Sequence, residues 1–186
     1  MKYAASLAAL VFACAFPAYG QSDLEQGFDG ALRGCEKWIL DPASWVDGPA
    51  PFKKAIGLGT KMGLVRSVED VNLPPAEWRR GNLYWRINST EGAGYILIVS
   101  DQIPMCHITG GGNTDLQPVV EAVIVSPMFN SRWARQASSF KGGMITTRFR
   151  NRKVPALSIL ISRADKPHQR LDHVQIVATA FYAMGK

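Results

Sequence analysis

The chain has 186 residues, a formal net charge of +6 and 47% hydrophobic residues. That length suits one domain with a sizeable core, and no shift in composition marks a second one. After residue 20 no apolar run is long enough to cross a membrane as a helix, so we expect no membrane span.

The first 20 residues have the layout of a cleavable secretory signal. Lys2 precedes an apolar run over residues 3–16, Pro17 ends that run, and residues 18–20 place small side chains at both positions that a signal peptidase reads. We therefore expect a signal peptide over residues 1–20, a single α+β domain over 21–186, and a periplasmic or secreted location. The alternative is a lipoprotein box over residues 11–14, in which Cys14 carries the acyl chains.

Cleavage after residue 20 would leave two cysteines, Cys35 and Cys106. An exported protein meets an oxidising compartment, so an even pair predicts a disulfide. The alternative is two buried cysteines that stay unpaired.

Helical periodicity is clearest at the start of the expected domain. Ser22 and Glu25 have the spacing of a capping box. After them, apolar side chains recur every three or four residues through Ile39, which predicts a helix with one buried stripe. The apolar stripe is Leu24, Phe28, Leu32, Cys35 and Ile39.

Strand patterns dominate the rest of the chain, with alternation in Leu83, Trp85 and Ile87 as the clearest case. A glycine-rich break at residues 110–112 is expected to precede a second helix. Because the strands follow one another through short turns, antiparallel pairing is favoured. The fold expected is α+β, a single antiparallel sheet of five to seven strands with two packed helices. The expected strands are residues 61–68, 82–88, 95–99, 103–108, 144–150, 156–163 and 174–184.

A basic hairpin is the most informative candidate site. Residues 148–170 hold seven basic side chains against one acid, Asp165. A focused positive surface attracts phosphates, nucleic acid, anionic glycans or lipid headgroups. The simpler interpretation is a solvated strand face whose charges protect a sheet edge from aggregation. The expected anion-binding residues are Arg148, Arg150, Arg152, Lys153, Arg163, Lys166 and Arg170.

Other chemical patterns are too incomplete to predict an activity. The glycines at 110–112 lack the lysine of a phosphate-binding loop, and the Ser-x-x-Lys spacing of Ser138 and Lys141 lacks its partner motifs. The three histidines do not have the ligand spacing of a zinc site. We therefore expect no cofactor and no metal, and the catalytic residues, if any, are unknown.

Three short segments, residues 34–38, 105–107 and 143–148, resemble small uncharacterised exported proteins of Gram-negative bacteria. The resemblance implies a periplasmic or secreted location and no particular activity. The leading hypothesis is a non-enzymatic binding or accessory protein that engages an anionic cell-envelope component, or another protein, through the basic hairpin. Nucleic acid is not expected as the partner. The alternative is a small secreted hydrolase whose site is assembled from scattered residues and is not visible in the linear sequence. A cluster of His107 with a carboxylate such as Asp101 or Glu121 in a deep pocket would favour this alternative.

Overall fold

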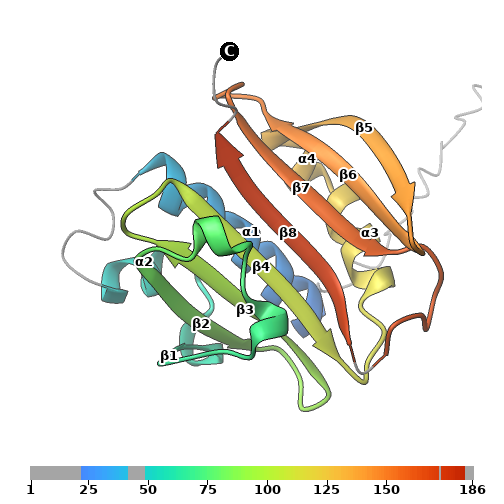
Figure 1. The fold of residues 1–186 in the computed structure, drawn as a ribbon, viewed down its shortest axis with the longest axis horizontal. Helices are drawn as coiled ribbons and strands as arrows, with labels where there is room; N and C mark the ends of the chain where they lie inside the picture. Colours follow the sequence, from blue (N-terminus) through green and yellow to red (C-terminus); the bar gives the residue numbers. More distant parts are fainter. Residues whose placement is uncertain (1–21, 42–48, 172, 183–186) are drawn as a thin grey trace, which may run out of the picture.

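A computed structural model of the chain describes residues 22–41, 49–171 and 173–182. The expected signal peptide and the Cys14 alternative lie outside the described residues. Within them, the strands form one antiparallel sheet in the order β1-β2-β3-β4-β8-β7-β6-β5, with α1, α3 and α4 behind it in Figure 1. The elements are α1 (Asp23–Leu40), α2 (Pro49–Ala55), β1 (Met62–Val65), β2 (Asn82–Asn88), β3 (Ala93–Ser100), β4 (Met105–Gly112), α3 (Gln117–Val125), α4 (Pro127–Arg132), β5 (Trp133–Lys141), β6 (Met144–Asn151), β7 (Leu157–Ala164) and β8 (Val174–Tyr182).

The prediction of five to seven strands and two helices is wrong, because the described residues form eight strands and four α-helices. The missed strand is β5, where only Trp133 is buried, so no alternation of apolar residues marks it. Helix α2 lies in a proline-rich stretch without a period. The expected second helix is divided at Ser126 into α3 and α4, because Pro127 begins a new helix that Ser126 caps.

The glycines at 110–112 also differ from expectation. They belong to β4, which continues through Gly112, whereas the prediction ended this strand at Ile108. Gly110 faces the helices, where an added Cβ would lie 2.7 Å from the Tyr95 ring. The strand can therefore pass beside this aromatic side chain only because residue 110 has none.

The chain order repeats across the molecule. Helix α1 precedes the antiparallel strands β1 to β4, and helices α3 and α4 precede the antiparallel strands β5 to β8. Strand β4 then pairs with β8, from Met105 opposite Phe181 to Gly111 opposite Val174, and joins the two halves into one sheet.

Helix α1 begins where the sequence predicted, since the Ser22 side chain accepts a hydrogen bond from the Glu25 N–H at 3.2 Å. Its predicted apolar stripe is buried against β3 and β4. The predicted disulfide is confirmed: Cys35 in α1 is bonded to Cys106 in β4. The indole N–H of Trp38 donates to the Ser100 carbonyl at 2.7 Å, a second tie between this helix and the sheet.

The two faces of the sheet differ in chemistry. The inner face, toward the helices, carries a row of fully buried side chains across five neighbouring strands, and these residues form the core with α1, α3 and α4. The row is Leu97, Ile108, Ala178, Ile161 and Thr147. The outer face carries both polar and apolar side chains, and the rest of the chain covers only part of it.

The connection between β1 and β2, residues 66–81, covers the outer face of β3 and β4 (Figure 1). We name this segment the strap. Its two single-turn 3-10 helices, Asp70–Asn72 and Ala76–Trp78, hold it in place. The Thr109 hydroxyl donates to Asn72 Oδ1 at 2.6 Å, and the rings of Trp78 and Phe181 lie 6.3 Å apart. The outer face of β6, β7 and β8 extends beyond the strap.

Loss of the disulfide is expected to lower the free energy of unfolding by about 4 kcal/mol. The two cysteines are separated by 71 residues, and closing so long a loop removes much of the entropy of the unfolded chain. Urea unfolding of the Cys35→Ala/Cys106→Ala variant measures this. A loss below about 1 kcal/mol would show that the bridge does not constrain the unfolded chain in this way.

Gly27→Ala is expected to destabilise the protein by roughly 1–3 kcal/mol, although alanine is the better helix former by about 1 kcal/mol. An added Cβ would lie 2.1 Å from the buried Ser89 hydroxyl oxygen and 3.1 Å from the Tyr95 ring. In a Ser89→Ala background the same change should cost less. Thermal unfolding of the four variants measures the coupling, and stabilisation by Gly27→Ala in both backgrounds would contradict this packing argument.

Candidate functional site

The structure divides the seven basic residues of the predicted site into three groups. Residues along β6 alternate between the two faces of the sheet. Arg148 and Arg150 are exposed on the outer face, and Thr147 and Phe149 are buried on the inner face. Arg152 and Lys153 follow in the exposed loop between β6 and β7. We name these four residues, Arg148, Arg150, Arg152 and Lys153, the basic face.

Arg163 does not belong to the basic face. It lies on the inner face of β7 with 3% of its surface exposed. Its Nε donates to Glu121 Oε1 in α3, and its Nη1 donates to Thr147 Oγ1 at 3.2 Å. This guanidinium ties α3 to the sheet and is not available to a partner.

Lys166 and Arg170 lie in the connection from β7 to β8, at the opposite end of β7 from the basic face. Eight strand residues separate the two ends, a span of about 26 Å. Arg170 also donates to the Val174 carbonyl at 2.9 Å. The predicted seven-residue surface is therefore a four-residue cluster plus two distant cations and one buried arginine.

An aromatic residue supports the basic face. The Arg148 guanidinium carbon lies 5.8 Å from the centre of the Phe181 ring, within the range of a cation–π contact. Phe181 in turn contacts Trp78 of the strap. Between Arg148 and the strap, Leu160 and Thr179 lie half-buried on the outer face in the same cross-strand row. Neither Arg148 nor Arg150 forms an ion pair with any residue that the structure describes.

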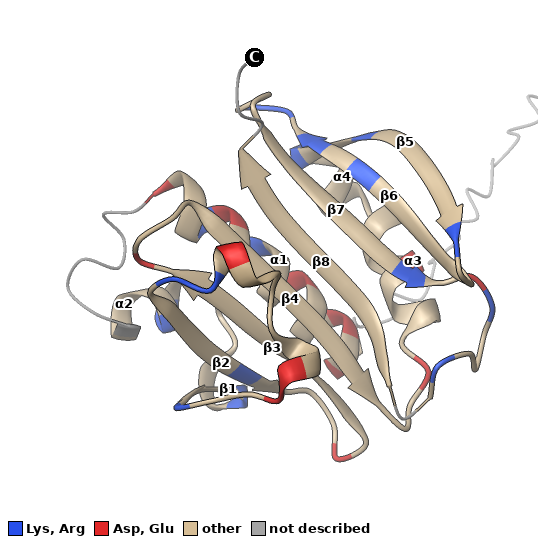
Figure 2. Cartoon of the chain, viewed as in Figure 1, with Lys and Arg blue, Asp and Glu red and all other residues tan. Residues whose placement is uncertain are grey.

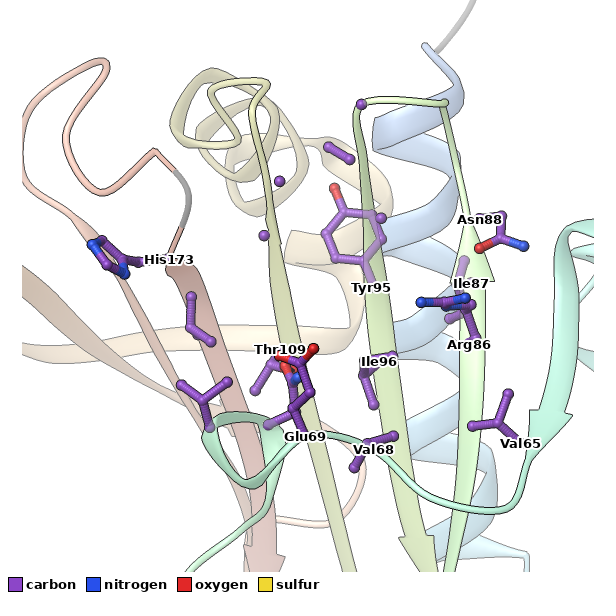
Figure 3. Close-up of a pocket in the computed structure, with 18 of the residues that line it drawn as sticks. Val65, Val68, Glu69, Arg86, Ile87, Asn88, Tyr95, Ile96, Thr109 and His173 are labelled. Atoms are coloured by element: carbon purple, nitrogen blue, oxygen red, sulfur yellow. Dashed lines mark hydrogen bonds between the residues drawn. The ribbon is translucent and has the colours of Figure 1, made fainter.

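A second candidate is a trough of about 940 Å³ on the outer face of β2, β3 and β4. The strap forms one wall, and the turn between β2 and β3 closes an end (Figure 3). Gly94 and Gly111 are Cα partners on neighbouring strands, so two adjacent positions of the floor have no side chain. Arg86 of β2 and Glu69 of the strap both border the trough.

His107 lies on the outer face of β4, 4% exposed, and its Nδ1 forms a 2.9 Å hydrogen bond with the Thr179 hydroxyl. Desolvation by burial lowers the pKa of His107 to about 4, so the ring is neutral near pH 7. A carboxylate beside His107 would have favoured the hydrolase hypothesis. Glu121 lies on the other side of the sheet with Arg163, and Asp101 is exposed and makes no hydrogen bond to His107.

The remaining motifs have structural roles. Ser138 of the Ser-x-x-Lys spacing exchanges a 3.1 Å hydrogen bond with Thr147, not with Lys141. The His168 backbone N–H donates to Asp115 Oδ2 at 2.9 Å, and its ring Nδ1 lies 3.8 Å from the same oxygen. No group of three or more His, Cys, Asp or Glu side chains in the described part of the chain could hold a metal ion.

Searches against protein-family models, curated proteins and solved structures find no match. The site must therefore be interpreted from its own geometry. Among the helices that the structure describes, none has the length and apolar composition needed to cross a membrane.

Sequence reasoning missed the trough and the aromatic support of Arg148. Glycines at Gly94 and Gly111 inside strand patterns were the available signal for the trough, since such glycines mark close approach of a ligand or another backbone. No local pattern indicates that Trp78, Phe181 and Arg148 are neighbours, because their contacts depend on the fold of the strap.

The low pKa of His107 predicts a pH-dependent stability. In the unfolded chain the ring gains a proton near pH 6.5, whereas in the folded protein it gains one only near pH 4. The free energy of unfolding should therefore fall as the pH is lowered through this window, by roughly 3 kcal/mol from this residue. The His107→Asn variant, whose amide can keep the contact with Thr179, should not lose this roughly 3 kcal/mol as the pH is lowered. Urea unfolding at several pH values tests this, and parallel pH profiles of the two proteins would contradict it.

Proposed function

We propose that the protein is an exported, periplasmic or secreted, non-enzymatic binding or accessory protein that holds an anionic cell-envelope component on its basic face. The observation that carries the proposal is the placement of Arg148 and Arg150. Both are exposed on the outer face of β6, Arg148 lies next to the Phe181 ring, and neither has an acidic partner among the described residues.

The spacing of these two arginines supports joint binding of one anion-rich ligand. Side chains two residues apart on a strand project from the same face about 7 Å apart. This separation is below the Debye length of about 8 Å at physiological salt, so their fields add. Guanidinium groups also bind carboxylate, phosphate or sulfate through paired hydrogen bonds.

Other arginines of the chain differ from Arg148 and Arg150 because they form ion pairs with acidic side chains. Arg33 contacts Asp29 within α1, whereas Arg132 of α4 contacts both Asp29 and Glu36 and so links α4 to α1. Such charges serve the fold and are neutralised within it. No residue of the basic face forms an ion pair with a described residue, and Figure 2 shows basic positions in blue along β6.

The compartment is part of the same proposal. The disulfide between Cys35 and Cys106 is of the kind that persists in oxidising compartments, and the first 20 residues have the composition of a secretory signal. An extracytoplasmic location favours anionic glycans or lipid headgroups over nucleic acid as the partner.

The test compares two double variants that lose the same charge. Arg148→Gln/Arg150→Gln removes two cations of the basic face, and Arg66→Gln/Arg80→Gln removes two exposed cations of the strap. All four are exposed, so each change should alter the stability by less than about 0.5 kcal/mol. We expect the first variant to bind heparin and phosphatidylglycerol vesicles at least roughly tenfold more weakly than the wild type, and the second to bind nearly as the wild type.

Elution from a heparin column over a salt gradient and vesicle sedimentation measure these affinities. Loss on heparin alone would identify an anionic glycan as the partner class, and loss on vesicles alone would identify lipid headgroups. Equal losses in the two variants, or no retention of the wild type at low salt, would refute a specific role for the basic face.

A further inference from the structure

The trough on β2, β3 and β4 is a site distinct from the basic face. Its floor at Gly94 on β3 and Arg148 on β6 are four strand spacings apart, about 19 Å. Its volume of about 940 Å³ is at the upper end of the range of about 300–1,000 Å³ found for small-molecule sites. A single amino acid would leave most of this space empty.

Two glycines leave the floor of the trough without side chains, because an added Cβ would lie 2.5 Å from the Ile87 carbonyl oxygen at Gly94 and 2.8 Å from the His173 carbonyl oxygen at Gly111. Gly94 and Gly111 are opposite one another on β3 and β4, and both take part in the floor. A molecule in the trough can therefore lie directly against the strand backbone. Ile96, on the same strand as Gly94, is half-buried, and in the strap Val68 is half-buried and Val71 is 62% exposed, so the floor and the strap wall both offer apolar contact.

Opposite charges line the same trough without pairing. Arg86 extends from β2 and Glu69 from the strap, on different sides of the space in Figure 3. Both side chains are exposed, and neither forms an ion pair with a described residue. The cross-strand neighbour of Arg86 on β1 is Gly63, which has no side chain to shield the guanidinium.

We propose that the trough binds a short peptide with free termini, its carboxylate held by Arg86 and its ammonium group by Glu69. A ligand with both charges satisfies both side chains at once. An extended tripeptide is about 10 Å long and would place its small side chains against the valines and Ile96, with its backbone over the glycine floor. A purely anionic ligand would meet Glu69 and Glu91 in the same lining, and an apolar ligand would cover Arg86 without pairing it.

The probe is trialanine, compared with its N-acetylated and C-amidated forms. Two-dimensional amide NMR of the mature protein follows each titration. We expect saturable shifts at the amides of Gly94, Ile96 and Gly111 with free trialanine, and binding at least roughly tenfold weaker with either blocked form.

Two variants, each lacking one charged side chain of the trough, test separately how the carboxylate and the ammonium group of the peptide are bound. Arg86→Gln should weaken binding of trialanine and remove the preference for a free carboxylate, while the preference for a free ammonium group stays. Glu69→Gln should weaken binding of trialanine and remove the preference for a free ammonium group, while the preference for a free carboxylate stays. Arg150→Gln, a change in the basic face, should leave binding of the peptide unaltered, which keeps this test separate from that of the proposed function.

The proposal is overturned if trialanine causes no saturable shifts up to millimolar concentration, or if the shifts lie away from the trough. It is also overturned if the blocked peptides bind as well as the free one. Unchanged binding in both Arg86→Gln and Glu69→Gln, with intact amide spectra, would equally exclude the assigned contacts.

Discussion

The pairing of β4 with β8 is the constraint on which the rest of the molecule depends. These two strands are far apart in the sequence, yet their ladder joins two four-stranded halves into one sheet. Strand β4 also contacts the elements that lie over both faces of the sheet. Cys106 binds it to α1 through the disulfide, and Thr109 binds it to the strap through Asn72. Both candidate surfaces depend on this pair of strands, because β4 forms part of the trough floor and β8 carries Phe181, the ring that contacts Arg148.

The two faces of the sheet differ in how much of them the rest of the chain covers. Helices α1, α3 and α4 cover the inner face, and the ion pair between buried Arg163 and partly exposed Glu121 connects α3 to the sheet. On the outer face the strap covers only the middle, over residues such as His107 and Thr109. Two regions stay open beside it, the trough and the basic face. Substitutions in these open regions should therefore change binding with little effect on the fold, since exposed changes usually have small effects on stability.

Local signals predicted the parts of the fold that depend on local chemistry. The capping serine of α1, its buried stripe and the Cys35–Cys106 bridge followed from spacing and compartment. Strand β5 was missed because an edge strand with exposed side chains does not alternate. The sequence also grouped Arg163 with Arg148, although strand and loop geometry place them on opposite faces. Contacts between distant segments, such as Trp78 with Phe181, have no local signature at all.

The central claim is that the outer face of β6 and β7 is the binding surface for an anionic partner. Amide NMR of the mature protein with a heparin tetrasaccharide tests it most directly, because it locates contacts and does not only measure retention. The account predicts saturable shifts confined to residues 146–153 and to the outer-face positions Ser158, Leu160 and Ser162. Shifts spread evenly over exposed cations elsewhere, such as Lys53, Lys54 and Arg66, would contradict it and leave the charges of β6 as a solvated strand face.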